Sequence, residues 1–131
     1  MQSLQPPIGL KVEMVEATTA ELVWSLPSNG AHHIDFFFRA RYWREGQHGS
    51  LALEQDVQST DSGCLLDELE PGTRYWANIF TLSADEHQWS NSSNICEFTT
   101  LDRNISMGKL LFYLQLIQNA YLIFLKGNKT Y

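Results

Sequence analysis

Apolar and polar residues alternate in short stretches through the first 100 residues of the chain. The clearest of these stretches lie at 10–14, 20–24, 36–42 and 75–81. Clusters of turn-forming residues separate them, such as the Pro-Ser-Asn-Gly run at 27–30. Alternation is typical of strands, because successive side chains of a strand point to opposite faces. No run of ten or more residues with helical spacing occurs before Leu101, so this part is predicted to be β-structure.

The same alternation assigns side chains to the core. We expect these residues to face inward: Leu10, Val12, Met14, Ala20, Leu22, Trp24, Phe36, Phe38, Ala40, Tyr42, Cys64, Leu66, Tyr75, Ala77, Ile79, Thr81, Cys96 and Phe98. A weaker strand is expected at 51–57. Seven short strands in about a hundred residues predict an all-β sandwich.

Several landmarks then resemble one family. The run Leu-Glu-Pro-Gly-Thr-Arg-Tyr at 69–75 is similar to the L-x-P-G-T-x-Y signature of fibronectin type III domains. The opening 6–12, Trp24, the Trp-Ser pair at 89–90 and the closing Phe-Thr-Thr at 98–100 resemble the same family in order and spacing. The resemblance covers 4–100 and implies an immunoglobulin-like sandwich of seven strands. The structural core that it implies includes Trp24, Leu69, Pro71 and Tyr75.

The residue types of the turn before Tyr75 favour its formation on physical grounds. Pro71 presets the backbone of the turn, and Gly72 relaxes it. The Tyr75 ring is then expected to pack inward while its hydroxyl reaches a backbone group upstream, which is the tyrosine-corner arrangement.

The residues that alternation places outward carry the candidate function. The resemblance makes the strands at 36–42 and 75–81 neighbours, so their outward aromatic and arginine side chains are expected to share one face. The candidate partner surface is Phe37, Arg39, Arg41, Trp43, Trp76, Phe80 and Trp89. Two interpretations stay open: a ladder in which arginines cover the rings, or an exposed surface for a protein partner.

The function implied by the resemblance is a non-catalytic binding module of a cell-surface receptor or adhesion protein. Its partner would be a protein ligand or a receptor subunit, contacted by the sheet face and by the loops at 27–35 and 84–93. The run at 89–93 partly resembles the W-S-x-W-S motif of cytokine receptors, with Ser92 in the place of the second tryptophan. The alternative is an intracellular spacer or scaffold domain.

Charge divides the chain into two parts. The formal net charge is −6, which argues against a nucleic-acid partner, because neutralising phosphates requires a basic face. Up to Thr100 there are 5 Lys+Arg and 14 Asp+Glu; from Leu101 onward there are 4 Lys+Arg and 1 Asp. Such a shift often marks a boundary. We therefore expect a domain at 4–100 and an apolar, basic tail at 101–131.

The tail contains sixteen uncharged residues, 110–125, between Lys109 and Lys126. As a helix this run would span about 24 Å, whereas a bilayer core is about 30 Å thick. Gln115, Gln118 and Asn119 would share one helical face, which favours an amphipathic helix on the domain or on a membrane surface. A true membrane span, a hairpin around 118–119 and a terminus outside any fold are the alternatives.

No catalytic, metal or cofactor site is predicted. His32 and His33 are adjacent, and neighbouring side chains of an extended segment diverge, so one ion would not bind both easily. Cys64 and Cys96 are expected to be inward-facing, inert thiols. The resemblance places them in different sheets, which predicts that they are unpaired.

Three glycosylation sequons begin at Asn91, Asn104 and Asn128, and Asn91 is the best placed because it lies in a predicted surface loop. The first ten residues contain Pro6 and Pro7 and lack the pattern of a secretory signal peptide. Either the chain is not secreted on its own, or the sequence begins inside a longer product. The sequons and the apolar tail favour a cell-membrane or extracellular location, and the missing signal favours the cytoplasm.

Overall fold

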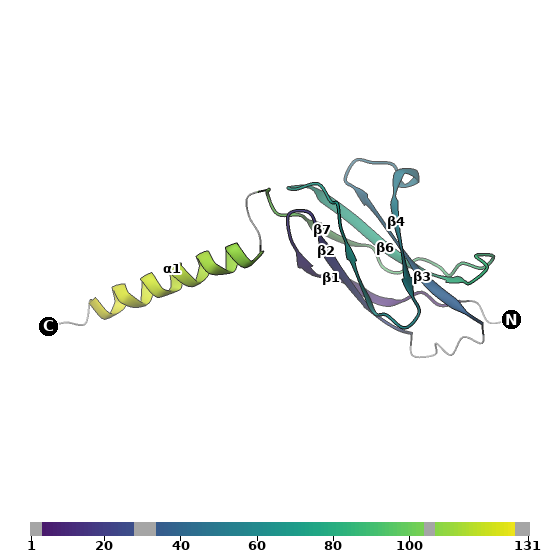
Figure 1. Ribbon diagram of the computed structural model, residues 1–131, viewed down its shortest axis with the longest axis horizontal. Coiled ribbons are helices and arrows are strands. Elements are labelled where there is room, and N and C mark those ends of the chain that lie inside the picture. Colours follow the sequence, from purple (N-terminus) through teal and green to yellow (C-terminus); the bar gives the residue numbers. More distant parts are fainter. Residues whose placement is uncertain (1–3, 28–33, 104–106, 128–131) are drawn as a thin grey trace.

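The alternating stretches form two antiparallel sheets packed face to face, as the computed structural model of the chain shows (Figure 1). The structure describes residues 4–27, 34–103 and 107–127. The strands are β1 (Ile8–Val15), β2 (Ala20–Ser25), β3 (Phe36–Arg44), β4 (Leu53–Gln58), β5 (Gly63–Leu66), β6 (Arg74–Ser83) and β7 (Cys96–Thr99), with a short 3-10 helix at Gly49–Leu51 and a helix α1 at Met107–Gly127. The predicted all-β sandwich of seven strands is confirmed.

One sheet has the strand order β1-β2-β5, and the other has the order β4-β3-β6-β7. The core lies between them. Trp24 of β2 is 5% exposed and meets the Phe38 ring of β3 edge to face, with the ring centroids 5.7 Å apart. Leu22, Leu66 and Ile79 are fully buried around this pair. Burial of apolar side chains from both inner faces is what holds such a sandwich together.

Alternation assigns two residues to the wrong face, one inward and one outward. Met14 is 50% exposed, because β1 carries irregularities between Ile8 and Lys11 and between Val12 and Met14 that break the alternation. The second concerns Leu82, which continues the outward set of β6 but is fully buried. Its burial follows from the bridge that it forms with Trp89, which folds the next loop back over the end of β6.

The turn before β6 has the expected geometry. Tyr75 is 4% exposed, its ring stacks on Phe98 with centroids 5.6 Å apart, and its Oη accepts a hydrogen bond of 2.8 Å from the Glu70 backbone N–H. Gly72 has a φ of 61°, a value that glycine adopts without strain. Leu69 is buried and Pro71 is half-buried, so the turn is fixed both by packing and by hydrogen bonds.

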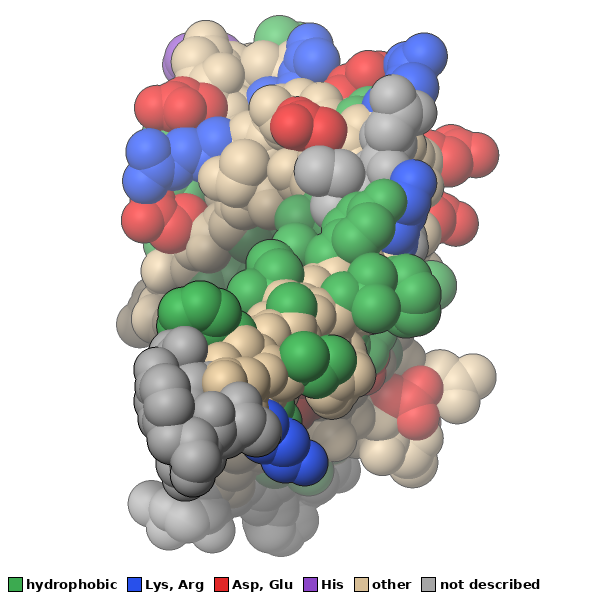
Figure 2. Space-filling model, turned by 90° about the vertical axis from the view of Figure 1, so that its left-hand side faces the viewer, with side chains coloured by type: hydrophobic (Ala, Val, Ile, Leu, Met, Phe, Trp, Pro, Cys, Tyr) green, Lys and Arg blue, Asp and Glu red, His purple; other side chains and the backbone are tan. Residues whose placement is uncertain are grey.

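The tail is a single helix, so the hairpin alternative is wrong. α1 has 21 residues and spans about 31 Å, longer than the expected 24 Å because Lys109 and Lys126 lie inside the helix. It projects away from one end of the sandwich in Figure 1, and hydrophobic side chains gather along it in Figure 2. From Leu111 to Gly127 every residue is exposed, so this part of the helix is not packed against the domain.

Candidate functional site

The candidate surface is built on the antiparallel pair β3 and β6. Their register places Arg39 opposite Phe80 and Trp43 opposite Trp76. Phe37 precedes Arg39 on the same outer face of β3, because residues two apart in a strand share a face. The predicted outward residues of the two strands therefore lie on one face of the four-stranded sheet.

Four of these side chains form a cluster that we call the distal patch: Phe37, Arg39, Phe80 and Trp89. The Arg39 guanidinium lies 5.4 Å from the centre of the Phe37 ring and 5.5 Å from the Trp89 ring. The Phe80 and Trp89 rings meet edge to face, 5.5 Å apart. Both distances from Arg39 lie in the cation–π range, and the ring pair has a favourable aromatic geometry.

Acidic residues hold Arg39 in place from two sides. Its Nε donates to Asp56 at 2.7 Å, and its Nη2 donates to Glu86 at 2.6 Å. The hydrogen bond to Asp56 is the largest effect that raises the pKa of Arg39 above its ordinary value. The Arg39 side chain is only 14% exposed. The guanidinium is therefore a fixed positive charge that orders the rings on either side.

Trp89 is the exposed member of the distal patch. Trp89 is 46% exposed, whereas Phe37 and Phe80 are half-buried. The loop that carries Trp89 closes through the Ser83 N–H, which donates to the Gln88 carbonyl at 3.0 Å. This loop lies at the end of the sandwich opposite α1 (Figure 1). The distal patch is therefore presented away from the helix.

The other predicted surface residues form a second group nearer α1, the proximal group: Arg41, Trp43 and Trp76. Trp76 Nε1 donates to Glu97 at 3.2 Å, and this hydrogen bond, followed by that of Arg74 at 2.8 Å, lowers the pKa of Glu97. Arg41 Nη2 donates to the Gly49 carbonyl at 3.0 Å. Arg41 Nε lies 3.7 Å from a Glu54 carboxylate oxygen and makes no hydrogen bond, so the polar atoms of this group are only partly satisfied within the domain.

The candidate surface thus has two differently built halves. Arg39 of the distal patch is covered by acids and rings, which is a feature of the self-covering ladder, whereas Arg41 of the proximal group contacts Glu54 and the Gly49 carbonyl. The distal patch also leaves Trp89 nearly half exposed, which is a feature of a partner surface. The two interpretations describe the same residues and are compatible.

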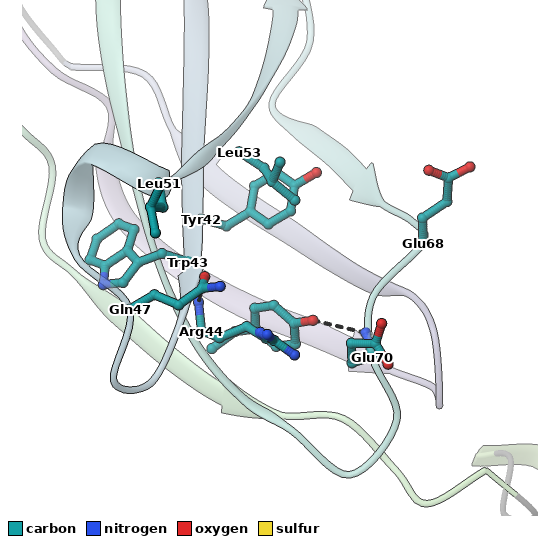
Figure 3. A pocket seen from close by; sticks show the side chains of 9 residues that line it. Tyr42, Trp43, Arg44, Gln47, Leu51, Leu53, Glu68 and Glu70 are labelled. Atoms are coloured by element: carbon teal, nitrogen blue, oxygen red, sulfur yellow. Dashed lines mark hydrogen bonds between the residues drawn. The ribbon is translucent and has the colours of Figure 1, made fainter.

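A shallow hollow adjoins the proximal group. It has a volume of about 230 Å³ and lies between β3, β4 and the turn before β6. Figure 3 shows Trp43, Leu51 and Leu53 on one side of it and Glu68 and Glu70 on the other. Its lining therefore combines an apolar wall with two carboxylates.

Serine side chains after Trp89 replace a missing stretch of strand beside β6. Ser90 Oγ accepts from the Thr81 N–H at 2.9 Å, and Ser93 Oγ accepts from the Ile79 N–H at 2.9 Å. The Ser90 and Ser93 backbone N–H groups donate back to the carbonyls of the same two residues. In sequence this run only resembles a receptor motif, and its role as a hydrogen-bonding strip depends on the pairing with β6.

Sequence reasoning also missed the acids that position the arginines. Asp56 lies opposite Arg39 in the register of β3 and β4, and Glu97 lies opposite Trp76 in that of β6 and β7. The alternation of charged residues along β4 was a usable signal once the pairing of strands was known. Glu86 gave no such signal, because it lies in a loop and has a positive φ of 62°.

The two cysteines are unpaired and lie in different sheets, on edge strands β5 and β7. They are half-buried and pack against the core, as their inward assignment predicted. Burial raises the pKa of both thiols to about 11. Thiolates are the reactive form of cysteine, so both thiols are poor nucleophiles at neutral pH.

Other candidate residues are distributed as follows. Asn91 is exposed and directly follows the hydrogen-bonded Ser90, beside the distal patch. His32, His33, Asn104 and Asn128 lie outside the described residues. Within 4–27, 34–103 and 107–127 there is no group of three or more potential metal-binding side chains.

The fold and this sheet face define an immunoglobulin-like module. The sequence profile of the fibronectin type III domain matches residues 5–95, and the chain belongs to this family. No curated protein sequence matches the chain.

Solved structures agree on the fold. A structure titled "Myokine structure" is similar with a TM-score of 0.62 and 20% identity, covering 76% of this chain and 99% of that one. The FN1–FN3 domains of chicken CNTN1 give a TM-score of 0.67 at 16% identity, covering 76% of this chain and 32% of that one. A computer-based redesign of a β-sandwich protein gives 0.61 at 28% identity, covering 77% and 99%.

Proposed function

We propose that this chain is a non-catalytic, membrane-held binding module of a receptor or adhesion protein, and that its distal patch contacts a protein partner. The observation that carries the proposal is Trp89, which is 46% exposed and is fixed between Phe80 and Arg39 at the end of the sandwich opposite α1. Tryptophan and arginine are the residues that most often dominate binding energy in protein interfaces.

Pre-organisation supports the same assignment. The ion pairs of Arg39 with Asp56 and Glu86 hold the guanidinium beside the Trp89 ring before any partner arrives. A surface that is already ordered loses less conformational entropy on binding. The acidic rim formed by Asp56 and Glu86 favours a partner with a basic or neutral contact surface.

α1 supports the membrane part of the proposal. Its Gly108–Gly127 segment is long and apolar enough to cross a bilayer, and none of it is buried in protein. A helix that lies on a membrane surface needs a strongly charged face, whereas α1 has no charge between Lys109 and Lys126. A spanning helix accommodates a lysine near each end, because the long side chain reaches the headgroup region.

Photo-crosslinking on cells tests the partner surface. The full chain is expressed with p-benzoylphenylalanine at position 89, and a matched variant carries it at Leu65, which is 59% exposed on the other sheet. We expect a discrete protein adduct from position 89 and none from position 65. Equal adducts from both positions, or none from either, would contradict the partner surface.

The intracellular scaffold is a second candidate, favoured by the two unpaired thiols. An N-glycosidase gel shift on the same cells separates the two. A shift that disappears in Asn91→Gln places the sandwich in the secretory lumen and supports the receptor function. An unshifted protein in the soluble fraction supports the scaffold instead.

A further inference from the structure

α1 carries a regular seam along one side of the helix. Leu111, Gln115, Gln118, Leu122 and Leu125 follow one another at steps of 4, 3, 4 and 3 residues. This is the heptad spacing that lets two helices pack along their whole length with a slight left-handed crossing. All five residues are exposed in the structure.

The middle of the seam is polar. Gln115, Gln118 and Asn119 lie within about one turn of the centre of α1, and Gln115 Nε2 donates to Asn119 Oδ1 at 3.2 Å. A primary amide has two donor hydrogens and an acceptor oxygen, so this single bond leaves most of their capacity unused. In a bilayer the centre of the helix lies in hydrocarbon, where no water is present to satisfy these groups.

We propose that α1 associates with α1 of a second copy of this chain in the membrane, through this seam. The inference rests on the proposed function, because it requires the helix to span the bilayer. Every copy would enter the membrane in the same direction, so equivalent residues lie at equal depth in a parallel pair. A two-fold axis then brings Gln115 and Gln118 against the same residues of the partner.

The amide group makes this face complementary to itself. It both donates and accepts, so two facing glutamines can exchange a pair of hydrogen bonds, as polar residues do between membrane helices. The opposite side of α1 lacks this property, because it presents Ile117 and Phe124, which are 66% and 63% exposed and apolar. The apolar side can face lipid directly, whereas the amide groups of the polar side need hydrogen-bond partners from another helix.

Energy transfer between labelled full-length chains tests the inference. Chains with a donor or an acceptor dye at the C-terminus are co-reconstituted in phosphatidylcholine vesicles at increasing lipid-to-protein ratios. We expect transfer that decreases with dilution along a dimer isotherm. The Gln115→Leu, Gln118→Leu double variant should raise the apparent dissociation constant about tenfold, since interhelical amide bonds are of this strength.

The control variant is Ile117→Leu, Phe124→Leu, which should leave the dissociation constant within about twofold, because it changes only the lipid-facing side. The glutamine variants are more apolar than the parent, so their insertion is not weakened. Equal effects of the two double variants on the dissociation constant would contradict association through this seam.

Alkaline extraction of the vesicles distinguishes the two proposals. A chain that resists extraction but shows no transfer overturns self-association alone, and its amide face then belongs to another membrane helix. A chain that is extracted overturns both the anchor and the seam.

Discussion

Replacing Ser93 with alanine tests whether the serine strip stabilises the sandwich. Ser93 is 8% exposed, and its hydroxyl accepts from the Ile79 N–H and donates to the Asn94 carbonyl, both at 2.9 Å. Ile79 is fully buried, so water has no open route to the freed N–H. The substitution therefore leaves a buried donor without an acceptor, and such a group costs about 1–3 kcal/mol.

The assay is urea unfolding of the full chain in a mild nonionic detergent, followed by tryptophan fluorescence. All four tryptophans lie in the sandwich, so the signal reports on this domain and not on α1. We expect the free energy of unfolding to fall by about 2 kcal/mol with an unchanged dependence on urea. In a thermal scan the same loss lowers the Tm by roughly 10 °C.

Ser92→Ala is the matched control. Its hydroxyl is also hydrogen-bonded, to Asn78 and to the Ser93 carbonyl, but the residue is exposed, so water replaces those bonds. Its effect should stay below about 0.5 kcal/mol. A Ser93→Ala loss as small as this would refute the strip as a stabilising element. Ser93→Ala also removes the Asn91 sequon, so the stability comparison uses protein without glycans.

Three further outcomes follow from the structure. Trp24→Ala should lower the free energy of unfolding by about 3–5 kcal/mol, because it empties the contact with Phe38 in the core; a loss below about 1 kcal/mol in urea unfolding contradicts this. The hydrogen bonds from Trp76 and Arg74 lower the pKa of Glu97 in the folded chain. Its ionised carboxylate therefore adds its full contribution to folding stability above the ordinary pKa of 4.5, and this contribution is lost as the pH falls through the lower, folded pKa. Glu97→Gln should lack this part of the acid dependence of the urea midpoint, and an unchanged profile argues against it. Cys64 and Cys96 should react slowly with a thiol reagent at pH 8 in the folded chain and rapidly in urea, because burial raises the pKa of both to about 11; detection of no thiols in unreduced, unfolded protein would show that they are paired.

The strands were largely predictable because alternation is a local property. The inward set of β2, with Ala20, Leu22 and Trp24, is buried as the pattern indicated. β1 is different, because its irregularities shift the faces and expose Met14. The exposure of Met14 cannot be predicted from the local sequence, because the position of a bulge depends on how the neighbouring strand pairs.

The residues of the candidate surface could be predicted from the sequence, but the ionic contacts that hold Arg39 in place could not. Alternation placed Phe37, Arg39 and Phe80 outward, and the pairing of β3 with β6 brought them together. Glu86 reaches Arg39 from 47 residues away in the sequence. A contact of this kind depends on where a loop returns, which no local pattern encodes.

The sequence by itself determined the strand segments and the turn at Pro71, because propensity and periodicity act over a few neighbouring residues. It marked 110–125 as an uncharged, apolar run but did not decide between a helix and a hairpin there. Only the tertiary structure decided which charges neutralise Arg39, which serines serve β6, and that Trp89 stays exposed at the end far from α1. Those outcomes are pairings between distant segments. They are fixed when the two sheets close over the core, because side chains from different strands then occupy a common volume.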